Sequence, residues 1–172
     1  MTVLKRITEG VVNALNWAEE AIDPDSVVLP GFRRSLQFDG YSCGVQSTFM
    51  ILHYYGKARS VLNVERELGT NADGTTTRQI RSLIARRGLH STIIPKARLR
   101  DLRSQINQGR PVLISPLDST HWSVVYGYSP KIGVYVADPF LPVGLSCLYS
   151  EEEFNDYWDR WAMPVYEGKF AD

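Results

Sequence analysis

The pattern of apolar and polar positions divides the chain into a helical first part and a strand-rich second part. Residues 43–55 are apolar nearly all round, which is typical of a buried central helix, and Gly56 supplies its stop. Apolar side chains that recur every three or four residues predict further helices at 1–21, 60–69, 77–87 and 98–108. The first two thirds of the chain are therefore expected to be mainly helical.

The pattern changes at Pro111, after which short runs are rich in Val, Ile and Tyr. These runs predict strands at 111–116, 121–128 and 133–138. Residues 129–132, which include a proline, predict the loop of a hairpin between the last two strands. Because helices come first and antiparallel strands follow, the order favours an α+β domain over a βαβ repeat.

A last helix is predicted near the C-terminus. Ser150 and Glu153 have the spacing of a capping box, and the aromatic side chains between 154 and 161 recur at helical spacing. Aromatic side chains in that pattern are typical of the core. We therefore expect a helix over this segment whose aromatic face is buried.

Two breaks near the N-terminus set the expected domain organisation. Asp23-Pro24-Asp25 ends the first helix, and Pro30-Gly31 follows shortly after. A chain of 172 residues is long enough for one domain with a sizeable core. We expect residues 1–30 to form a helical extension packed on a single domain of residues 31–172.

Charge and hydropathy narrow the possible partners. The 19 basic residues balance the 19 acidic ones, although nine basic residues and one acid lie between Arg78 and Arg110. Such a cluster can hold an acidic peptide or a nucleic acid, but we interpret it as a solvated face of two helices and expect no nucleic-acid partner. No apolar run approaches the ~20 residues that span a bilayer, and the N-terminus lacks the apolar core of a signal peptide. A cytoplasmic protein that does not span a membrane is expected.

Cys43 is the first candidate for chemistry, because it lies where a loop meets the start of the apolar helix. The positive end of a helix dipole favours the thiolate, which is the reactive form of cysteine. A lone cysteine is, however, more often a small buried apolar residue. The chain has only one other cysteine, Cys147, which lacks a nearby base in the sequence, and we expect it to be an inert free thiol.

The predicted hairpin brings His121 and Asp138 together. If residues 129–132 form the loop, these two side chains share one face of the sheet, with Cβ atoms about 5 to 8 Å apart. A carboxylate at that distance can orient an imidazole. A register slip of one residue would send them to opposite faces, so the prediction depends on the loop length.

Gln37 stands six residues before Cys43. Its side-chain amide, together with the Cys43 backbone N–H, can hold a developing oxyanion. A cysteine nucleophile needs a base within hydrogen-bond reach, and the base needs an orienting group. The four residues together supply these roles in the order Gln, Cys, His, Asp.

Several stretches around these residues resemble the peptidase C39 family of the papain-like cysteine peptidases, over roughly residues 35–161. They are 37–44 (QFDGYSCG), 49–56 (FMILHYYG), 109–114 (GRPVLI), 121–127 (HWSVVYG) and 136–139 (VADP). One position departs from many relatives, which carry an acidic residue before the cysteine where this chain has Ser42.

The resemblance implies a papain-like fold, in which N-terminal helices, including the central helix that bears the cysteine, pack on a C-terminal antiparallel sheet. It implies that Cys43 is the nucleophile, His121 the general base and then acid, Asp138 the group that orients His121, and Gln37 the oxyanion donor. The expected activity is thiol-dependent hydrolysis of a peptide or amide bond, such as the processing of a peptide precursor. No cofactor is implied, and the expected partner is a peptide or protein substrate.

Two alternatives stay open at this point. The same acyl-enzyme can pass its acyl group to an amine or thiol, which would make the protein an acyltransferase. Alternatively the chain is a non-catalytic module that binds a peptide through the basic region of 77–87 and 98–108, or docks onto another protein. Added amine nucleophiles would reveal a transferase, and unchanged peptide affinity without any product would reveal a binding module.

The other histidines are interpreted as structural. His53 lies within the apolar helix, ten residues after Cys43, so the two residues face roughly opposite ways. His90 lies just after Gly88, in a transition from loop to strand. Neither histidine pairs with a cysteine at the spacing of a zinc site, so no metal is expected.

Overall fold

Five helices pack on a seven-stranded antiparallel sheet in the computed structural model, which describes residues 23–37, 39–116, 120–140 and 147–168. The helices are α2 (Cys43–Tyr54), α3 (Val61–Leu68), α4 (Thr77–Arg86), α5 (Leu99–Asn107) and α6 (Glu151–Tyr157). The strands are β1 (Val27–Val28), β2 (His90–Ser91), β3 (Val112–Pro116), β4 (Ser123–Ser129), β5 (Gly133–Ala137), β6 (Leu148–Ser150) and β7 (Trp158–Tyr166). The predicted α+β class is confirmed.

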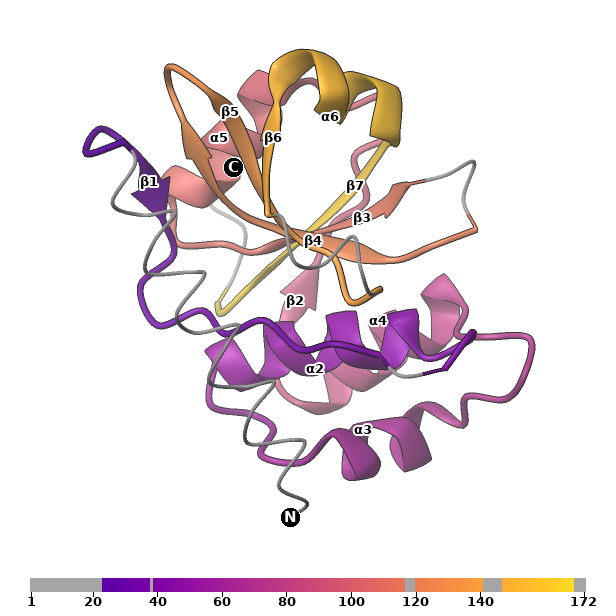
Figure 1. Ribbon diagram of the computed structural model, residues 1–172. Coiled ribbons are helices and arrows are strands. Elements are labelled where there is room, and N and C mark those ends of the chain that lie inside the picture. The colour runs from indigo at the N-terminus through magenta and orange to yellow at the C-terminus, as the bar shows by residue number, and fades with distance from the viewer. Residues whose placement is uncertain (1–22, 38, 117–119, 141–146, 169–172) are drawn as a thin grey trace, which may run out of the picture.

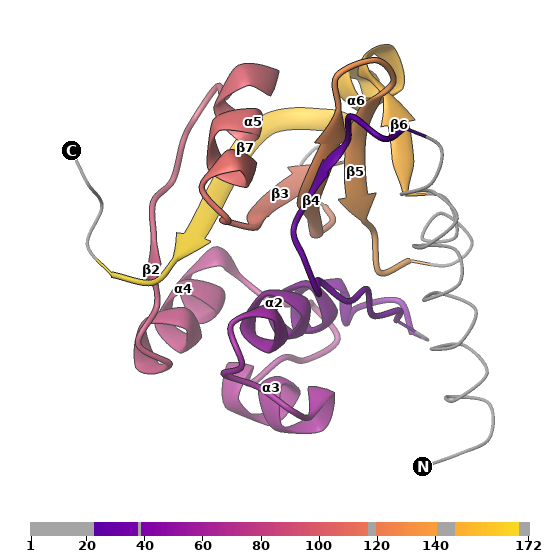
Figure 2. The ribbon, with the colours of Figure 1, turned by 90° about the vertical axis from the view of Figure 1, so that its left-hand side faces the viewer.

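The layers are visible in two perpendicular views. Helices α2, α3 and α4 lie together below the sheet, whereas α6 lies above it (Figures 1 and 2). The strand order is β2-β7-β3-β4-β5-β6, and β1 pairs with β4. The last described strand, β7, therefore lies between β2 and β3 and pairs with both.

Helix α2 occupies the core, as its apolar sequence predicted. Met50, Ile51 and Leu52 are fully buried, on successive positions that point to different sides of the helix. Burying a side chain of this size stabilises a fold by about 1.5–3 kcal/mol. The first residue of α2, Cys43, is therefore carried by one of the most firmly held elements of the molecule.

Two predicted helix starts are present with their caps. At α4, the Thr76 side chain accepts from the Gln79 backbone N–H, and the Gln79 side chain accepts from Thr76 in return. At α6, Ser150 and Glu153 make the same reciprocal pair. Each capping box satisfies two backbone groups that a helix end leaves unpaired.

The predicted extent of the last helix is wrong. Helix α6 ends at Tyr157, and Trp158–Tyr166 forms β7, with a left-handed residue, Arg160, at the irregularity near its start. The aromatic spacing up to residue 161 also fits a short helix followed by a strand. Pairing with β2 on one side and β3 on the other decides for the strand, because a central strand satisfies its backbone on both edges.

The predicted hairpin loop is one residue too long, since Ser129 already pairs with Gly133. On its own this difference would put His121 and Asp138 on opposite faces. The register shifts by one residue between Val125 and Gly127, however, so that Tyr126 is an extra residue in β4. This β-bulge cancels the offset and restores the common face.

The helix predicted over 1–21 lies outside the described residues, and the proposed division at residue 30 stays a prediction. The described part of that segment is tied to the sheet. Asp23 accepts a hydrogen bond from Ser129, Val28 pairs with Gly127, and Leu29 is buried. Residues 23–29 therefore belong to the same packed unit as the hairpin.

Candidate active site

The loop before α2 is shaped by one carboxylate. Asp39 Oδ1 accepts from the backbone N–H groups of Tyr41 at 2.9 Å and Ser42 at 2.7 Å. Burial opposes the charge of Asp39, but these hydrogen bonds from Tyr41 and Ser42 lower its pKa below the usual value. The turn delivers the chain directly into α2, so that Cys43 is the first residue of the helix.

The glycine next to the cysteine, Gly44, allows Thr75 and Trp122 to approach the start of α2 closely. A Cβ at Gly44 would lie 2.6 Å from Thr75 Cβ and 3.0 Å from Trp122 Cδ1. Trp122 in turn donates from Nε1 to the Thr75 carbonyl at 2.8 Å, and its own carbonyl accepts from Ser47 at 3.0 Å. These contacts hold the residue that follows His121 against the first turn of α2.

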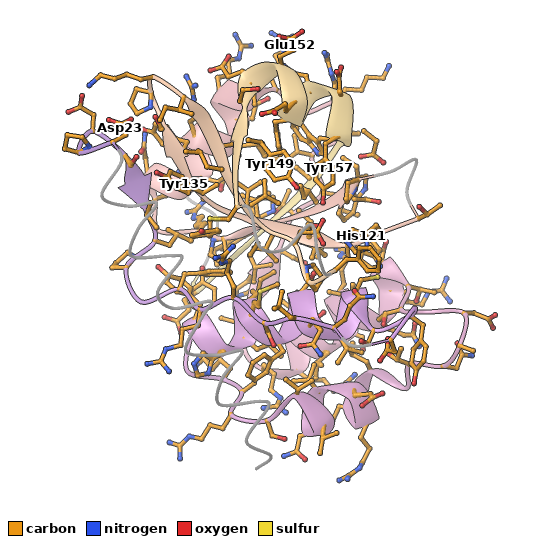
Figure 3. All side chains as sticks on the ribbon, viewed as in Figure 1. Asp23, His121, Tyr135, Tyr149, Glu152 and Tyr157 are labelled. Atoms are coloured by element: carbon orange, nitrogen blue, oxygen red, sulfur yellow. The ribbon has the colours of Figure 1, made fainter. Side chains whose placement is uncertain are left out.

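His121 and Asp138 meet between the sheet and α2. His121 lies two residues before β4, Asp138 follows β5 directly, and His121 Nε2 is 2.7 Å from Asp138 Oδ1. In Figure 3, His121 lies between the strands above and the helices below. Asp138 is only 2% exposed, so water does not compete for this hydrogen bond.

The imidazole of His121 also interacts with Cys43. Burial disfavours the imidazolium, but the hydrogen bonds to Asp138 and Cys43 and the charges of both groups raise the pKa of His121 to about 9. Because Nε2 faces Asp138, Nδ1 is the nitrogen left for the thiol. The sequence-predicted cysteine, histidine and aspartate therefore form one contiguous chain of contacts, which can share a proton between sulfur and nitrogen.

Gln37 reaches the loop that precedes Cys43. Its backbone N–H donates to the Pro139 carbonyl and its side-chain Nε2 donates to the Asp39 carbonyl, both at 2.7 Å. The second bond identifies which end of the amide carries the nitrogen, and Nε2 has one more N–H to donate. The residue is 4% exposed, and its side-chain Oε1 is buried without a hydrogen-bond partner among the described residues.

Two further residues complete the surroundings of Asp138, and sequence reasoning missed both. The Phe140 backbone N–H donates to Asp138 Oδ1 at 2.8 Å, and the Phe140 ring lies edge-on to His121 with centroids 6.4 Å apart. The Tyr157 hydroxyl is 2.5 Å from Asp138 Oδ2. The Asp-Pro-Phe sequence is a weak signal for a turn. Tyr157 belongs to the aromatic stripe that the sequence predicts to be core, and only the fold brings its hydroxyl to Asp138.

The residues interpreted as structural have partners of their own. His53 Nδ1 contacts the Ala58 carbonyl at 3.1 Å, His90 is an exposed residue stacked on Tyr166, and Cys147 is buried and accepts from the Tyr126 hydroxyl. Both cysteines are free. Among the described residues, no group of histidine, cysteine, aspartate and glutamate side chains is arranged to hold a metal ion.

A cavity of about 250 Å³ lies at the other end of α2 and contains none of the four candidate residues. It is lined by Gly56, Lys57, Ala58, Arg59, Ser60, Asn63, Val64 and Arg87. A twelve-residue helix is about 18 Å long, which separates this cavity from Cys43. The cavity and the four candidate residues therefore lie at opposite ends of α2.

Comparison with known proteins gives one family. The model of the peptidase C39 family matches residues 32–169. A search of curated proteins returns no match. None of the described helices is both long enough and apolar enough to cross a membrane.

Solved structures give the same fold. The chain is 20% identical, with a TM-score of 0.64, to a double glycine motif protease from an AMS/PCAT transporter in complex with the leader peptide, covering 77% of this chain and 89% of that one. It is 22% identical, with a TM-score of 0.66, to the peptidase domain of Streptococcus ComA, a bi-functional ABC transporter (80% and 99% covered). A putative C39-like peptidase from Bacillus anthracis gives 18% identity and a TM-score of 0.64 (84% and 99%). The predicted papain-like peptidase fold is confirmed.

Proposed function

The chain belongs to the peptidase C39 family of cysteine peptidases, and from that premise we propose that it cleaves a peptide bond with Cys43 as the nucleophile. His121 is the acid and base, Asp138 orients His121, and Gln37 donates to the oxyanion. The observation that supports this assignment most is the chain of contacts from Asp138 through His121 to Cys43.

The first step is attack of the Cys43 thiolate on the substrate carbonyl carbon. As the C–S bond forms, the carbonyl π electron pair moves onto oxygen. The Cys43 backbone N–H and Gln37 Nε2 donate hydrogen bonds to this oxyanion. The amide C–N bond breaks as the His121 imidazolium gives its proton to the leaving nitrogen. The products of this step are a free amine and a thioester on Cys43.

The second step is hydrolysis of the thioester. Neutral His121 takes a proton from water, whose oxygen attacks the thioester carbon. The C–S bond breaks, a carboxylic acid leaves, and Cys43 returns to thiolate beside the imidazolium. Asp138, which is 2% exposed, keeps the imidazole in one orientation through both steps.

We expect the substrate to be a peptide precursor. The structural neighbour bound to a leader peptide is a double glycine motif protease, so a peptide with Gly-Gly before the scissile bond is the first one to test. Its matched control carries Val-Val at those two positions. Cleavage of the Gly-Gly peptide alone would support precursor processing, and equal cleavage of both would contradict this preference.

Similarity to peptidase domains of transporters supports a cytoplasmic site of action and docking onto a second protein.

Alkylation of the two cysteines tests whether Cys43 and His121 act as a pair. With limiting iodoacetamide at about pH 6, where an ordinary thiol is mostly protonated, we expect Cys43 to react at least about tenfold faster than Cys147. In His121→Ala that advantage should disappear, because the thiolate loses its cationic partner. Peptide mass spectrometry gives both rates in one sample, with Cys147 as the internal control. Equal, slow reaction of both cysteines in the wild type would contradict the proposed site.

The raised pKa of His121 predicts the basic limb of the pH profile. Turnover needs the imidazolium to protonate the leaving amine, so kcat/KM should fall as the pH rises through about 9. Alkylation of Cys43 needs only the thiolate, so its rate should not fall over the same range. A basic limb near pH 6.5, the ordinary histidine value, would show that Asp138 and Cys43 do not hold the proton on His121.

A further inference from the structure

Tyr157 lies at the end of α6 with its hydroxyl between two buried polar groups. The oxygen is 2.5 Å from Asp138 Oδ2 and 2.7 Å from Ser123 Oγ. In Figure 3, Tyr157 and Tyr149 lie next to each other under α6, on the sheet side of His121. Ser123 is fully buried and Asp138 is nearly so. Water therefore does not replace the Tyr157 hydroxyl as the partner of either group.

The direction of these hydrogen bonds follows from the chemistry of the partners. An ionised carboxylate only accepts, so the Tyr157 hydroxyl donates to Asp138 and must accept from Ser123. The other oxygen, Oδ1, is occupied by His121 Nε2 and the Phe140 backbone N–H. Both oxygens of the carboxylate therefore have partners: Oδ1 has His121 and Phe140, and Oδ2 has Tyr157.

We propose that Tyr157 is a positioning residue, which holds the Asp138 carboxylate in the one rotation that directs Oδ1 at His121. This inference rests on the proposed function, because it assigns Tyr157 a role only through Asp138 and His121. Without the hydroxyl, Oδ2 has no donor from α6, and the carboxylate can rotate about its last bond. His121 then spends less time aligned with Cys43.

The Tyr157 phenol stays protonated, as a group that donates a hydrogen bond to Asp138 must. Burial and the neighbouring charge of Asp138 raise the pKa of Tyr157 far above its usual value, so the phenol keeps its proton throughout the working range.

Tyr149 provides a matched comparison. Its ring stacks on Tyr157 with centroids 5.1 Å apart, but its hydroxyl makes no hydrogen bond with any residue that the structure describes.

The test compares Tyr157→Phe with Tyr149→Phe, each of which removes one hydroxyl and keeps the ring. Cys43 alkylation at about pH 6 should slow about tenfold in Tyr157→Phe and stay within about twofold of wild type in Tyr149→Phe, since a hydrogen bond to a charged group is worth about that factor or more. On a cleaved peptide, kcat should fall about tenfold in Tyr157→Phe with KM unchanged, because the residue does not touch substrate.

The outcomes separate this inference from the function on which it rests. Slow Cys43 alkylation in the wild type would overturn the proposed function and this role with it. Fast alkylation in the wild type that persists in a folded Tyr157→Phe would overturn the role of Tyr157 alone. Equal slowing by both tyrosine variants would also overturn it, because ring packing rather than the hydroxyl would then be responsible.

A second measurement needs no variant of Tyr157 and decides the question if Tyr157→Phe does not fold. In the wild type with 13C-labelled tyrosine, the Tyr157 ring signal, assigned by through-bond correlation to its own backbone, should shift with the same midpoint as the His121 imidazole, near pH 9. The shared midpoint would report coupling through Asp138. A Tyr157 signal that does not respond when His121 titrates would overturn the proposal.

Discussion

Replacing Cys43 with alanine is expected to abolish peptide cleavage, with a fall in kcat/KM of at least about 10⁴-fold. Removing a member of a nucleophile–base pair typically costs this much or more, and what is left comes from binding and the oxyanion donors. The fold should be retained, because alanine fits the space of a small side chain that is 8% exposed at the start of α2. Turnover is followed by mass spectrometry of a cleaved peptide, and folding by circular dichroism.

The matched control for that variant is Cys147→Ala. Cys147 is fully buried, whereas Cys43 is 8% exposed, and the Cys147 sulfur accepts a hydrogen bond from the Tyr126 hydroxyl. We expect full peptidase activity in Cys147→Ala and a modest loss of stability of about 1 kcal/mol. Cleavage that persists in Cys43→Ala, or is lost only in Cys147→Ala, would contradict the assignment of the nucleophile.

Replacing Gly133 with alanine is expected to lower the free energy of unfolding by at least about 3 kcal/mol. A Cβ at this position would overlap the Tyr149 carbonyl oxygen and lie 2.9 Å from Ser150 Cα, both of them backbone of β6. Backbone cannot swing aside as a flexible side chain can, so β5 and β6 must separate. Urea denaturation measures the change.

Gly31→Ala is the control for that substitution. Gly31 has a φ of +74° with nothing within 4 Å of an added Cβ, so alanine there costs only backbone strain of about 1 kcal/mol. We expect Gly133→Ala to be clearly less stable than Gly31→Ala. It should also be less active, because β5 leads directly into Asp138. Equal stability of the two variants would show that the β5–β6 contact is looser than the structure has it.

Local sequence was enough to predict the elements whose signals come from neighbouring residues. The helix that begins at Cys43 follows from its continuous apolar run, and the capping box of Ser150–Glu153 follows from spacing alone. These patterns work because helix hydrogen bonds join residues four apart, so a helix is specified within its own segment. The α+β class follows from the order of such segments.

Residues far apart in the chain decided the rest. The hairpin loop is one residue shorter than predicted, and His121 faces Asp138 only because a bulge at Tyr126 restores the register. The strand Trp158–Tyr166 exists because β2 and β3 pair with its two edges.

The sequence by itself determined the helices α2 to α5, the start of α6, the fold class and a set of four residues whose chemistry matches a thiol peptidase. Tertiary structure decided that the Tyr157 hydroxyl donates a hydrogen bond to Asp138 and that Gln37 donates one to the Asp39 carbonyl. The physical reason is that strand pairing and side-chain contacts gain their free energy from partners that no local window contains, whereas helix and cap signals lie within a few residues.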